Sequence, residues 1–373
     1  MDFSELFVEI SKGIAVFTWG NAIMILAGLV LVTLAVVKEF EPVLLLPIGF
    51  GCILANLGMS ADQGVFKVLY DAGLKNGLFP LLIFVGVGAM IDFRPMLSMP
   101  KMALLGGAGQ FGIYATLLLA ILLGFPMNQA ASIGSIGSID GPTAIFVTSR
   151  LAPEILAPVT VAAYSYMSLI PIIQIPVMKL LTTRKERLIR MEYAARPVSN
   201  SVVIAFPIIV TVVVSLMAPD AAPLIAMLML GNLLRESGVV DRLSKAAQNE
   251  IINIATLFLG LTIGSTMTAD SFLNISTLMI LGLGFVAFVI DTVAGLMFGK
   301  AMAVVTGGKV NPLIGASGIS AFPMAGRLAA KVAKEEDFEN FILMHAVGAN
   351  TAGQLGSVIA GGLLLALTLG IMG

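Results

Sequence analysis

Long apolar stretches separated by short polar breaks dominate the 373-residue chain. A helix that crosses a bilayer needs about 20 predominantly apolar residues. The pattern places ten to twelve segments of this length or somewhat shorter, near residues 21–37, 42–58, 78–92, 102–124, 130–149, 156–181, 200–218, 221–234, 251–268, 275–298, 310–325 and 341–369. Because lipid offers the backbone no hydrogen-bonding partner, such segments are expected to be helical. The pattern therefore predicts an all-α, polytopic membrane protein.

Two of these segments are rich in residues that interrupt a helix. Glycine, serine and proline accumulate at 134–142 and again at 312–323. A broken backbone at membrane depth is tolerated only where protein or a watery cavity satisfies its polar groups. We therefore expect a broken helix within 130–149 and another within 310–325.

The two breaks also belong to a weak internal repeat. Residues 84–93 resemble 258–267, and residues 133–144 align with 314–325, which places Pro142 over Pro323. Paired broken segments in corresponding halves point to the binding site of a transporter. We therefore predict a transporter-like core of two inverted repeats, although Gly-rich membrane helices can also look alike by chance.

The repeat suggests a division of the chain into four parts. They are N-terminal transmembrane helices at 1–76, a first repeat at 77–181, a basic loop with connecting helices at 182–249, and a second repeat at 250–373.

Composition agrees with a membrane protein and excludes other classes. Hydrophobic residues make up 58% of the chain and charged residues 12%, against about 25% charged in soluble domains. A net charge of −1 offers no basic field for a nucleic acid. One cysteine and one histidine rule out a cysteine-rich or multi-histidine metal site within this chain. The most basic connection, 182–197, is expected in the cytoplasm by the positive-inside rule.

Asp140 is the first candidate for chemistry. It lies within an apolar, broken segment beside Ser138 and Thr143. A carboxylate at membrane depth costs a few kcal/mol unless it is paired, so it is by default a functional candidate. Carboxylate, hydroxyl and carbonyl oxygens suit a small alkali or alkaline-earth cation. The alternative is an aspartate at the water surface that caps the next helix.

The second break offers amide and hydroxyl oxygens but no carboxylate. Its polar residues are Asn311, Ser317 and Ser320, and Asn350 supplies a further amide within an apolar helix. A site between the two breaks would carry one negative charge, which balances a monovalent cation. For Asn350 the alternative is packing between helices.

Other residues give weaker signals. Tyr164 and Tyr166 are two apart, so at most one is expected to face a shared cavity. Asp291 is a second possible intramembrane carboxylate. Arg327 follows the second break and could hold a carboxylate through its fork of donors, or simply end a helix.

Four of these stretches carry a resemblance to a known family. Residues 137–146 (Gly-Ser-Ile-Asp-Gly-Pro-Thr-Ala-Ile-Phe), 163–171, 311–320 and 348–357 resemble, in this order, the integral-membrane β subunits of the sodium-pumping biotin-dependent decarboxylases. That family acts on oxaloacetate, methylmalonyl-CoA, glutaconyl-CoA and malonate. Its Asp-Gly-Pro motif usually follows alanine, whereas Ile139 stands here; the difference changes packing and not the ligand.

The resemblance implies a function. Carboxybiotin, carried by a separate subunit, would be decarboxylated here, and the energy would drive Na⁺ out of the cell while a proton is consumed. The implied cofactors are Na⁺ and biotin. The implied partners are a carboxyltransferase subunit, a biotin carrier subunit and a small membrane-anchored subunit, with several copies of this chain in the complex. The expected location is the inner membrane of a prokaryotic cell.

The resemblance also implies roles for individual residues. Asp140 and Tyr166 would be catalytic, Tyr166 as the proton donor, and Arg327 would bind carboxybiotin. The implied Na⁺-binding residues are Asp140, Asn311, Gly315, Ser320 and Asn350. His345 lies outside the four motifs and is expected to matter less. The relatively short chain looks more like the methylmalonyl- or glutaconyl-CoA type than the oxaloacetate type.

The residues alone leave a second function open. Repeats with broken helices equally suit a stand-alone, Na⁺-coupled secondary transporter of an organic anion. A membrane scaffold without a site is disfavoured by Asp140.

Overall fold

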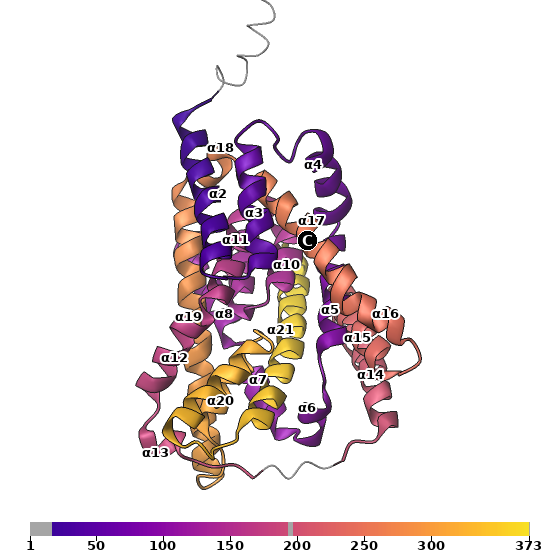
Figure 1. Cartoon of the computed structure of the whole chain (residues 1–373), viewed down its shortest axis with the longest axis vertical. Coiled ribbons are helices and arrows are strands. Elements are labelled where there is room, and N and C mark those ends of the chain that lie inside the picture. The colour runs from indigo at the N-terminus through magenta and orange to yellow at the C-terminus, as the bar shows by residue number, and fades with distance from the viewer. Residues whose placement is uncertain (1–16, 193–196, 373) are drawn as a thin grey trace, which may run out of the picture.

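A computed structural model describes residues 17–192 and 197–372, which form helices joined by short turns (Figure 1). Six helical stretches are long and apolar enough to cross a membrane: Trp19–Val37, Lys101–Leu122, Asn200–Met217, Asp241–Thr266, Ile275–Val305 and Leu343–Met372. Two bent pairs, Gly64–Leu74 with Leu78–Met90 and Pro153–Met167 with Ile170–Leu181, raise this number to eight if each pair is one span. The prediction of an all-α polytopic membrane protein is confirmed. The number of complete spans is below ten because several of the predicted segments are short or broken.

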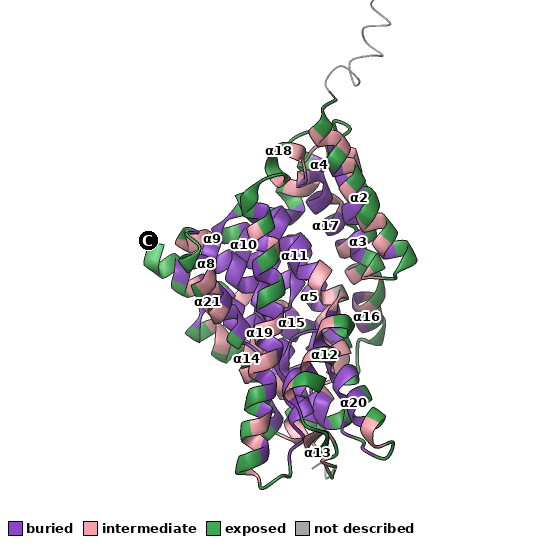
Figure 2. Cartoon of the chain, turned by 90° about the vertical axis from the view of Figure 1, so that its left-hand side faces the viewer, coloured by how far each residue is buried: buried purple, intermediate pink, exposed green. Residues whose placement is uncertain are grey.

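One set of helices, which we call the outer group, packs around α3 and α5. It comprises α2 (Trp19–Val37), α3 (Pro42–Ala55), α4 (Gly64–Leu69), α5 (Leu78–Met90), α14 (Asn200–Met217), α15 (Ala222–Glu236), α16 (Asp241–Ala246) and α17 (Ile252–Thr266). Glycines allow close approach: a Cβ on Gly28 would lie 2.7 Å from the carbonyl oxygen of Gly49 on the neighbouring helix. Small residues at helix contacts are typical of membrane proteins. Only 17% of the apolar windows of α2 and α14 is buried, so both helices are placed to face lipid (Figure 2).

A second set, the central group, contains both breaks. It comprises α7 (Lys101–Ala108), α8 (Phe111–Leu122), α9 (Met127–Gly134), η2 (Ser135–Ser138), α10 (Gly141–Leu151), α11 (Leu156–Ser168), α12 (Ile170–Leu181), α19 (Ile275–Val305), η6 (Pro312–Gly318), α20 (Met324–Glu336) and α21 (Leu343–Met372). Short connecting elements complete the described chain: η1 (Tyr70–Leu74), α6 (Arg94–Ser98), η3 (Pro153–Ile155), α13 (Arg184–Arg187), η4 (Pro219–Ala221), η5 (Ala247–Ile251) and α18 (Ala269–Phe272).

Both predicted breaks are present, and they touch. The first separates α9 from α10, with 3₁₀ backbone at η2. The second begins as the 3₁₀ stretch η6 rather than as an α-helix and continues into α20. The Ser320 hydroxyl in the second break donates a hydrogen bond of 2.7 Å to the carbonyl oxygen of Ser138 in the first. The two breaks therefore meet, as a site between them requires.

The two breaks pack on their long helices in a corresponding way. Gly134 lies against Ile113 and Leu117 of α8, and Gly315 lies against Gly295 and Gly299 of α19. The spacing within each pair is four residues, and the glycines are aligned by the sequence repeat. This agreement supports the repeat; the inverted relation of the two halves stays a prediction.

The basic connection is held by ion pairs at the lower end of the molecule in Figure 1. Arg187 contacts Glu336 at 2.6 Å and Arg190 contacts Asp337 at 2.6 Å, so this segment is fastened to the end of α20. The Arg187 guanidinium lowers the pKa of Glu336. Part of the predicted basic loop, 193–196, lies outside the described residues.

Candidate ion-binding site

Asp140 lies where the first break meets the next helix. It occupies the N-cap position of α10, and Ile139 before it has a left-handed backbone with φ of 54°. Such a conformation is uncommon outside glycine and often accompanies a functional site. The side chain is only 4% exposed, so Asp140 is not at the water surface in the described structure.

Neutral donors surround one oxygen of this carboxylate. Oδ2 accepts hydrogen bonds from Thr143 Oγ1 at 2.8 Å, Gln354 Nε2 at 2.9 Å and Ser357 Oγ at 2.9 Å. Within the described part of the chain, no cationic side chain forms an ion pair with it. The site thus keeps a negative charge available for a cation that enters from outside.

Sequence reasoning missed these donors as partners of Asp140. Thr143 was noted only as a neighbour, and Gln354 and Ser357 only as members of a motif. Gln354 and Ser357 are three apart and share a face of α21, which is the one signal that pairs them. Their separation of 214 and 217 residues from Asp140 hides the contact from the sequence.

Asp140 borders a cavity of about 360 Å³ that lies between the outer and central groups. A second carboxylate, Glu41 at the start of α3, lines the same cavity from the outer group. Other oxygen-bearing residues line it as well: Tyr164, Gln248, Asn253, Thr256, Ser320 and Gln354. Among the described residues, its lining includes no lysine, arginine or histidine. Two carboxylates and neutral oxygens suit a hard cation and do not suit an anion.

Only one of the two candidate tyrosines lines this cavity, and it is Tyr164. Its ring lies against Gly141, where a Cβ would overlap the ring, and both Asp140 and Glu41 act on it electrostatically. Tyr166 faces α19 instead, and its hydroxyl donates to the carbonyl oxygen of Leu281 at 2.6 Å. The structure therefore does not bring Tyr166 to Asp140, and its catalytic role stays a prediction.

The predicted residues of the second break divide into two sets. Ser320 lines the cavity, as described above. Asn311 does not: its amide donates to the carbonyl oxygens of Arg187 and Ile189 at 3.1 and 2.9 Å and so anchors the start of η6. Gly315 is the close contact with α19.

Asn350 holds the break from the side of α21. Its amide donates to the carbonyl oxygen of Ile319 at 2.7 Å. Gln110, between α7 and α8, donates to Gly318 and Gly353 at 3.3 and 3.2 Å. The carbonyl groups of Gly318 and Ile319 belong to the irregular backbone of the break, and these amides satisfy them. The structure thus places Asn350 beside the break and not in the lining of the Asp140 cavity.

The remaining candidates lie elsewhere. Arg327 is exposed on α20 and borders a separate cavity of about 410 Å³ with Lys331 and Lys334. Asp291 is fully buried in α19, where Oδ1 accepts from the Gly112 backbone N–H at 2.8 Å. The described residues contain no cluster of three or more His, Cys, Asp or Glu side chains that could hold a metal ion.

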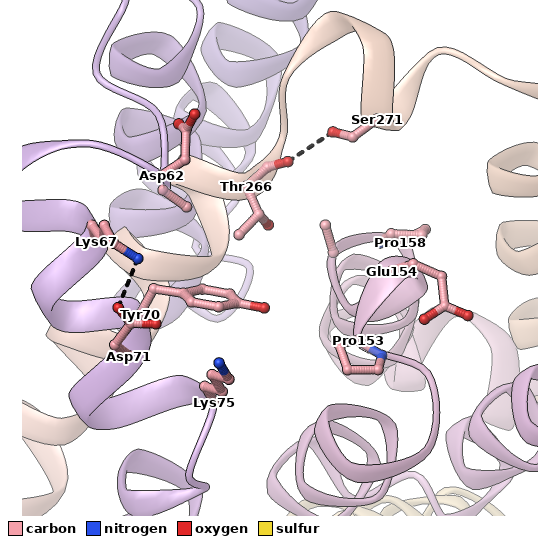
Figure 3. Close-up of a pocket in the computed structure, with 12 residues that line it drawn as sticks. Asp62, Lys67, Tyr70, Asp71, Lys75, Pro153, Glu154, Pro158, Thr266 and Ser271 are labelled. Atoms are coloured by element: carbon pink, nitrogen blue, oxygen red, sulfur yellow. Dashed lines mark hydrogen bonds and ion pairs between the residues drawn. The ribbon is translucent and has the colours of Figure 1, made fainter.

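A further polar cavity of about 410 Å³ lies near α4 and α18 (Figure 3). Tyr70 points into it from one side and Glu154 lies on the other. Its Lys67 is paired locally with Asp71 at 2.9 Å. None of the predicted site residues lines this cavity.

Two broken segments of this helical membrane protein meet beside a buried carboxylate that forms no ion pair within the described residues. This arrangement defines the class of ion-translocating membrane proteins. The particular family follows from comparison with known sequences. The family model of the Na⁺-transporting oxaloacetate decarboxylase beta subunit matches residues 20–368, and the chain belongs to this family. Its apolar helices and this membership make it a multi-pass protein of the prokaryotic inner membrane.

Curated relatives span nearly the same length. The chain is 51% identical over 359 residues to the glutaconyl-CoA decarboxylase subunit beta of Acidaminococcus fermentans, covering 95% of each chain. It is 52% identical over 356 residues to the methylmalonyl-CoA decarboxylase subunit beta of Veillonella parvula, again covering 95% of each. It is 45% identical to the oxaloacetate decarboxylase beta chain of Klebsiella pneumoniae, covering 93% of this chain and 94% of that one. The predicted family is confirmed.

Proposed function

We propose that this chain is the membrane subunit of a biotin-dependent decarboxylase, where it decarboxylates carboxybiotin and couples this reaction to Na⁺ export. The observation that carries the proposal is the environment of Asp140, a buried carboxylate held by three neutral donors at the contact between two broken segments. The names of the relatives support a decarboxylase over a stand-alone transporter of an organic anion.

The partners in this proposal are a carboxyltransferase subunit, a biotin carrier subunit and a small membrane-anchored subunit, with more than one copy of this chain in the complex. Decarboxylation breaks the bond between the carboxyl carbon and the ureido nitrogen of biotin. Carbon dioxide leaves, the electron pair stays on the nitrogen, and a proton neutralises it. The higher identity to the two CoA-ester decarboxylases, 51% and 52% against 45%, supports a CoA ester as the substrate of the complex.

In this proposal Na⁺ enters the cavity between the outer and central groups. Asp140 and Glu41 supply charge, and Ser320, Tyr164 and Gln354 supply neutral oxygens. Asn311, Gly315 and Asn350 act mainly by fixing the second break, because each holds η6 or the residues after it in place.

The decisive variant is Asp140→Asn in the assembled complex. The amide keeps the size of the side chain but removes the charge that balances the cation. We expect Na⁺-dependent decarboxylation of free carboxybiotin to be lost while the complex still assembles. Normal Na⁺ activation in this variant would contradict the proposed site. Asp220 is an exposed aspartate in η4, and Asp220→Asn is the matched control that should retain activity.

A further inference from the structure

A cavity of about 580 Å³ lies at the end of the molecule that carries the basic connection. It is formed where the turn between α6 and α7, the segment at 191–192, the turn after α19 and the start of α21 come together (Figure 1). The positive-inside rule places this end in the cytoplasm. None of the residues predicted from the sequence to bind Na⁺ or carboxybiotin lines it.

The charge of this cavity is suited to an anion. Lys101 and Lys309 line it, and within the described residues neither has an ion-pair partner. Glu192 is the one carboxylate that the described residues contribute to the lining, so their lysines outnumber their acids there. An anion that enters gains two charge-assisted contacts without displacing an existing ion pair.

The walls are suited to a ring that is partly apolar. Met99, Met102 and Met191 line the cavity. Methionine is flexible and polarisable, so it packs against irregular apolar shapes. A carboxylated ureido ring fused to a sulfur-containing ring, on an aliphatic arm, has this combination of one negative end and apolar sides.

Two elements connect this cavity to the Asp140 site. His345 lines the cavity and belongs to α21, the helix that also carries Gln354; nine residues of helix separate them by roughly 14 Å. Val310 lines the cavity too and directly precedes Asn311, where η6 begins. A ligand in the cavity therefore contacts the starts of the two segments that shape the ion site.

We propose that this cavity receives the carboxylated ureido ring of carboxybiotin, with Lys101 and Lys309 facing its carboxylate. This inference rests on the proposed function. The carrier subunit would present the ring from the cytoplasm, and the Na⁺ site would lie deeper, at Asp140.

The test measures decarboxylation of free carboxybiotin by the assembled complex carrying Lys101→Gln, Lys309→Gln or both. Removing a charged donor to a carboxylate is expected to raise KM about tenfold or more for each lysine, with a larger increase in the double variant. The Na⁺ concentration for half activation should stay unchanged. Lys309→Arg should restore most of the loss, and Lys67→Gln, in the cavity of Figure 3, is the control expected to behave as wild type.

The outcomes separate this inference from the proposed function. An unchanged KM in the double variant overturns the cavity assignment while leaving the Asp140 site intact. If instead Lys331→Gln raises KM and the Lys101 and Lys309 variants do not, the ring binds at the cavity of Arg327 and our assignment is wrong. A wild-type complex that does not decarboxylate free carboxybiotin overturns the proposed function and, with it, this inference. A thermal-shift measurement with Na⁺ shows whether each variant is folded.

Discussion

At Asp140 a charged group is buried, and no cationic side chain among the described residues pairs with it. Burying an isolated carboxylate is unfavourable, and hydrogen bonds to charged groups recover about 1.5–3 kcal/mol each. Thr143, Gln354 and Ser357 supply three such bonds to one oxygen. An arginine or lysine in their place would neutralise the carboxylate permanently, whereas neutral donors leave its charge for a mobile cation.

Glu41 is the residue whose involvement is most easily tested. Burial raises the pKa of its carboxyl above the ordinary value for glutamate. As pH falls, Glu41 should therefore be protonated at a higher pH than an exposed glutamate, and Na⁺ activation should weaken there because one negative charge is lost. Glu41→Gln is expected to raise the Na⁺ concentration for half activation and to remove this part of the pH dependence.

The control for Glu41 lies in the same turn. Glu39 also has a left-handed backbone, but it is exposed and does not line the cavity. Glu39→Gln should leave the Na⁺ activation curve unchanged at every pH. Equal effects of the two variants would show that the turn as a whole matters and not the Glu41 charge.

Tyr164 and Tyr166 are the candidate donors of the proton that decarboxylation consumes. Tyr166 is the donor that the family resemblance implies, yet its hydroxyl is bound to the Leu281 carbonyl in this structure. Leu281 and Thr306, which lines the cavity proposed for the ureido ring, lie 25 residues apart at opposite ends of α19, about 37 Å. Donation therefore requires the hydroxyl to leave the Leu281 carbonyl and the proton to be relayed to the ureido ring, because the two are not in direct contact. General acid catalysis contributes about 10²–10⁴-fold, so Tyr166→Phe should lower kcat by that order while Na⁺ still protects the protein from heat.

Two variants accompany Tyr166→Phe. His345→Gln should lower kcat much less, because no proton step is assigned to the imidazole; any effect should be on KM, since His345 lines the cavity proposed for the ureido ring. Tyr164→Phe should chiefly weaken Na⁺ binding, since this ring borders Asp140. If Tyr164→Phe loses catalysis and Tyr166→Phe does not, the proton donor is Tyr164, which lines the Asp140 cavity.

Among the elements, the second break depends on the close contact between η6 and α19. A Cβ on Gly315 would overlap the carbonyl oxygen of Gly295. This oxygen belongs to helix backbone, so moving it aside costs free energy. Overpacking of this kind typically costs about 1–3 kcal/mol. Gly315→Ala should therefore displace the break, raising the Na⁺ concentration for half activation and lowering kcat together.

Gly282 offers a matched control for that substitution. It lies on the same helix, α19, and a Cβ there would meet nothing within 4 Å. Alanine is also the better helix former, so Gly282→Ala should be silent or slightly stabilising in a steady-state assay with a thermal scan. Normal activity in Gly315→Ala would mean that the contact is not needed.

The elements themselves were largely predictable, because hydropathy and helix-breaking residues act locally. The segments at 21–37, 275–298 and 341–369 correspond to α2, α19 and α21, and both breaks occur where glycine, serine and proline accumulate. The 3₁₀ form of η6 was not expected. The residues at its two ends, Asn311 and Ile319, are held by hydrogen bonds to distant segments, which a local pattern does not encode.

The site was predictable only in part, for the same reason. Asp140 and Ser320 stand out by themselves, as polar residues in apolar surroundings. Glu41 was not singled out, since its place in the cavity depends on the outer group folding against the central group. Asn311 and Asn350 looked like ligands because an amide that binds a cation and an amide that satisfies a broken backbone are identical in a sequence.

For the whole molecule, the position of the cavity between the two groups suggests how access to it changes. Glu41, Ile83 and Ile252 line it from the outer group, and Asp140 and Tyr164 line it from the central group. Rocking of one bundle against another is a common form of alternating access. The moving units would then be the outer and central groups, which cut through both sequence repeats because α5 and α17 belong to the outer group, and both breaks would lie in the same unit.

This motion predicts a Na⁺-dependent change in distance between the groups. Spin labels at Val213 on α14 and Leu367 on α21, both exposed, report on one group against the other. A pair at Val30 on α2 and Phe50 on α3 lies within the outer group and is the control. The native Cys52 is fully buried and should remain unlabelled.

When K⁺ replaces Na⁺, we expect the distance distribution of the first pair to shift and that of the control pair to stay fixed. Asp140→Asn should abolish the shift, because a ligand moves an equilibrium only by binding the two states differently. A shift that persists in Asp140→Asn would show that Na⁺ acts through another site.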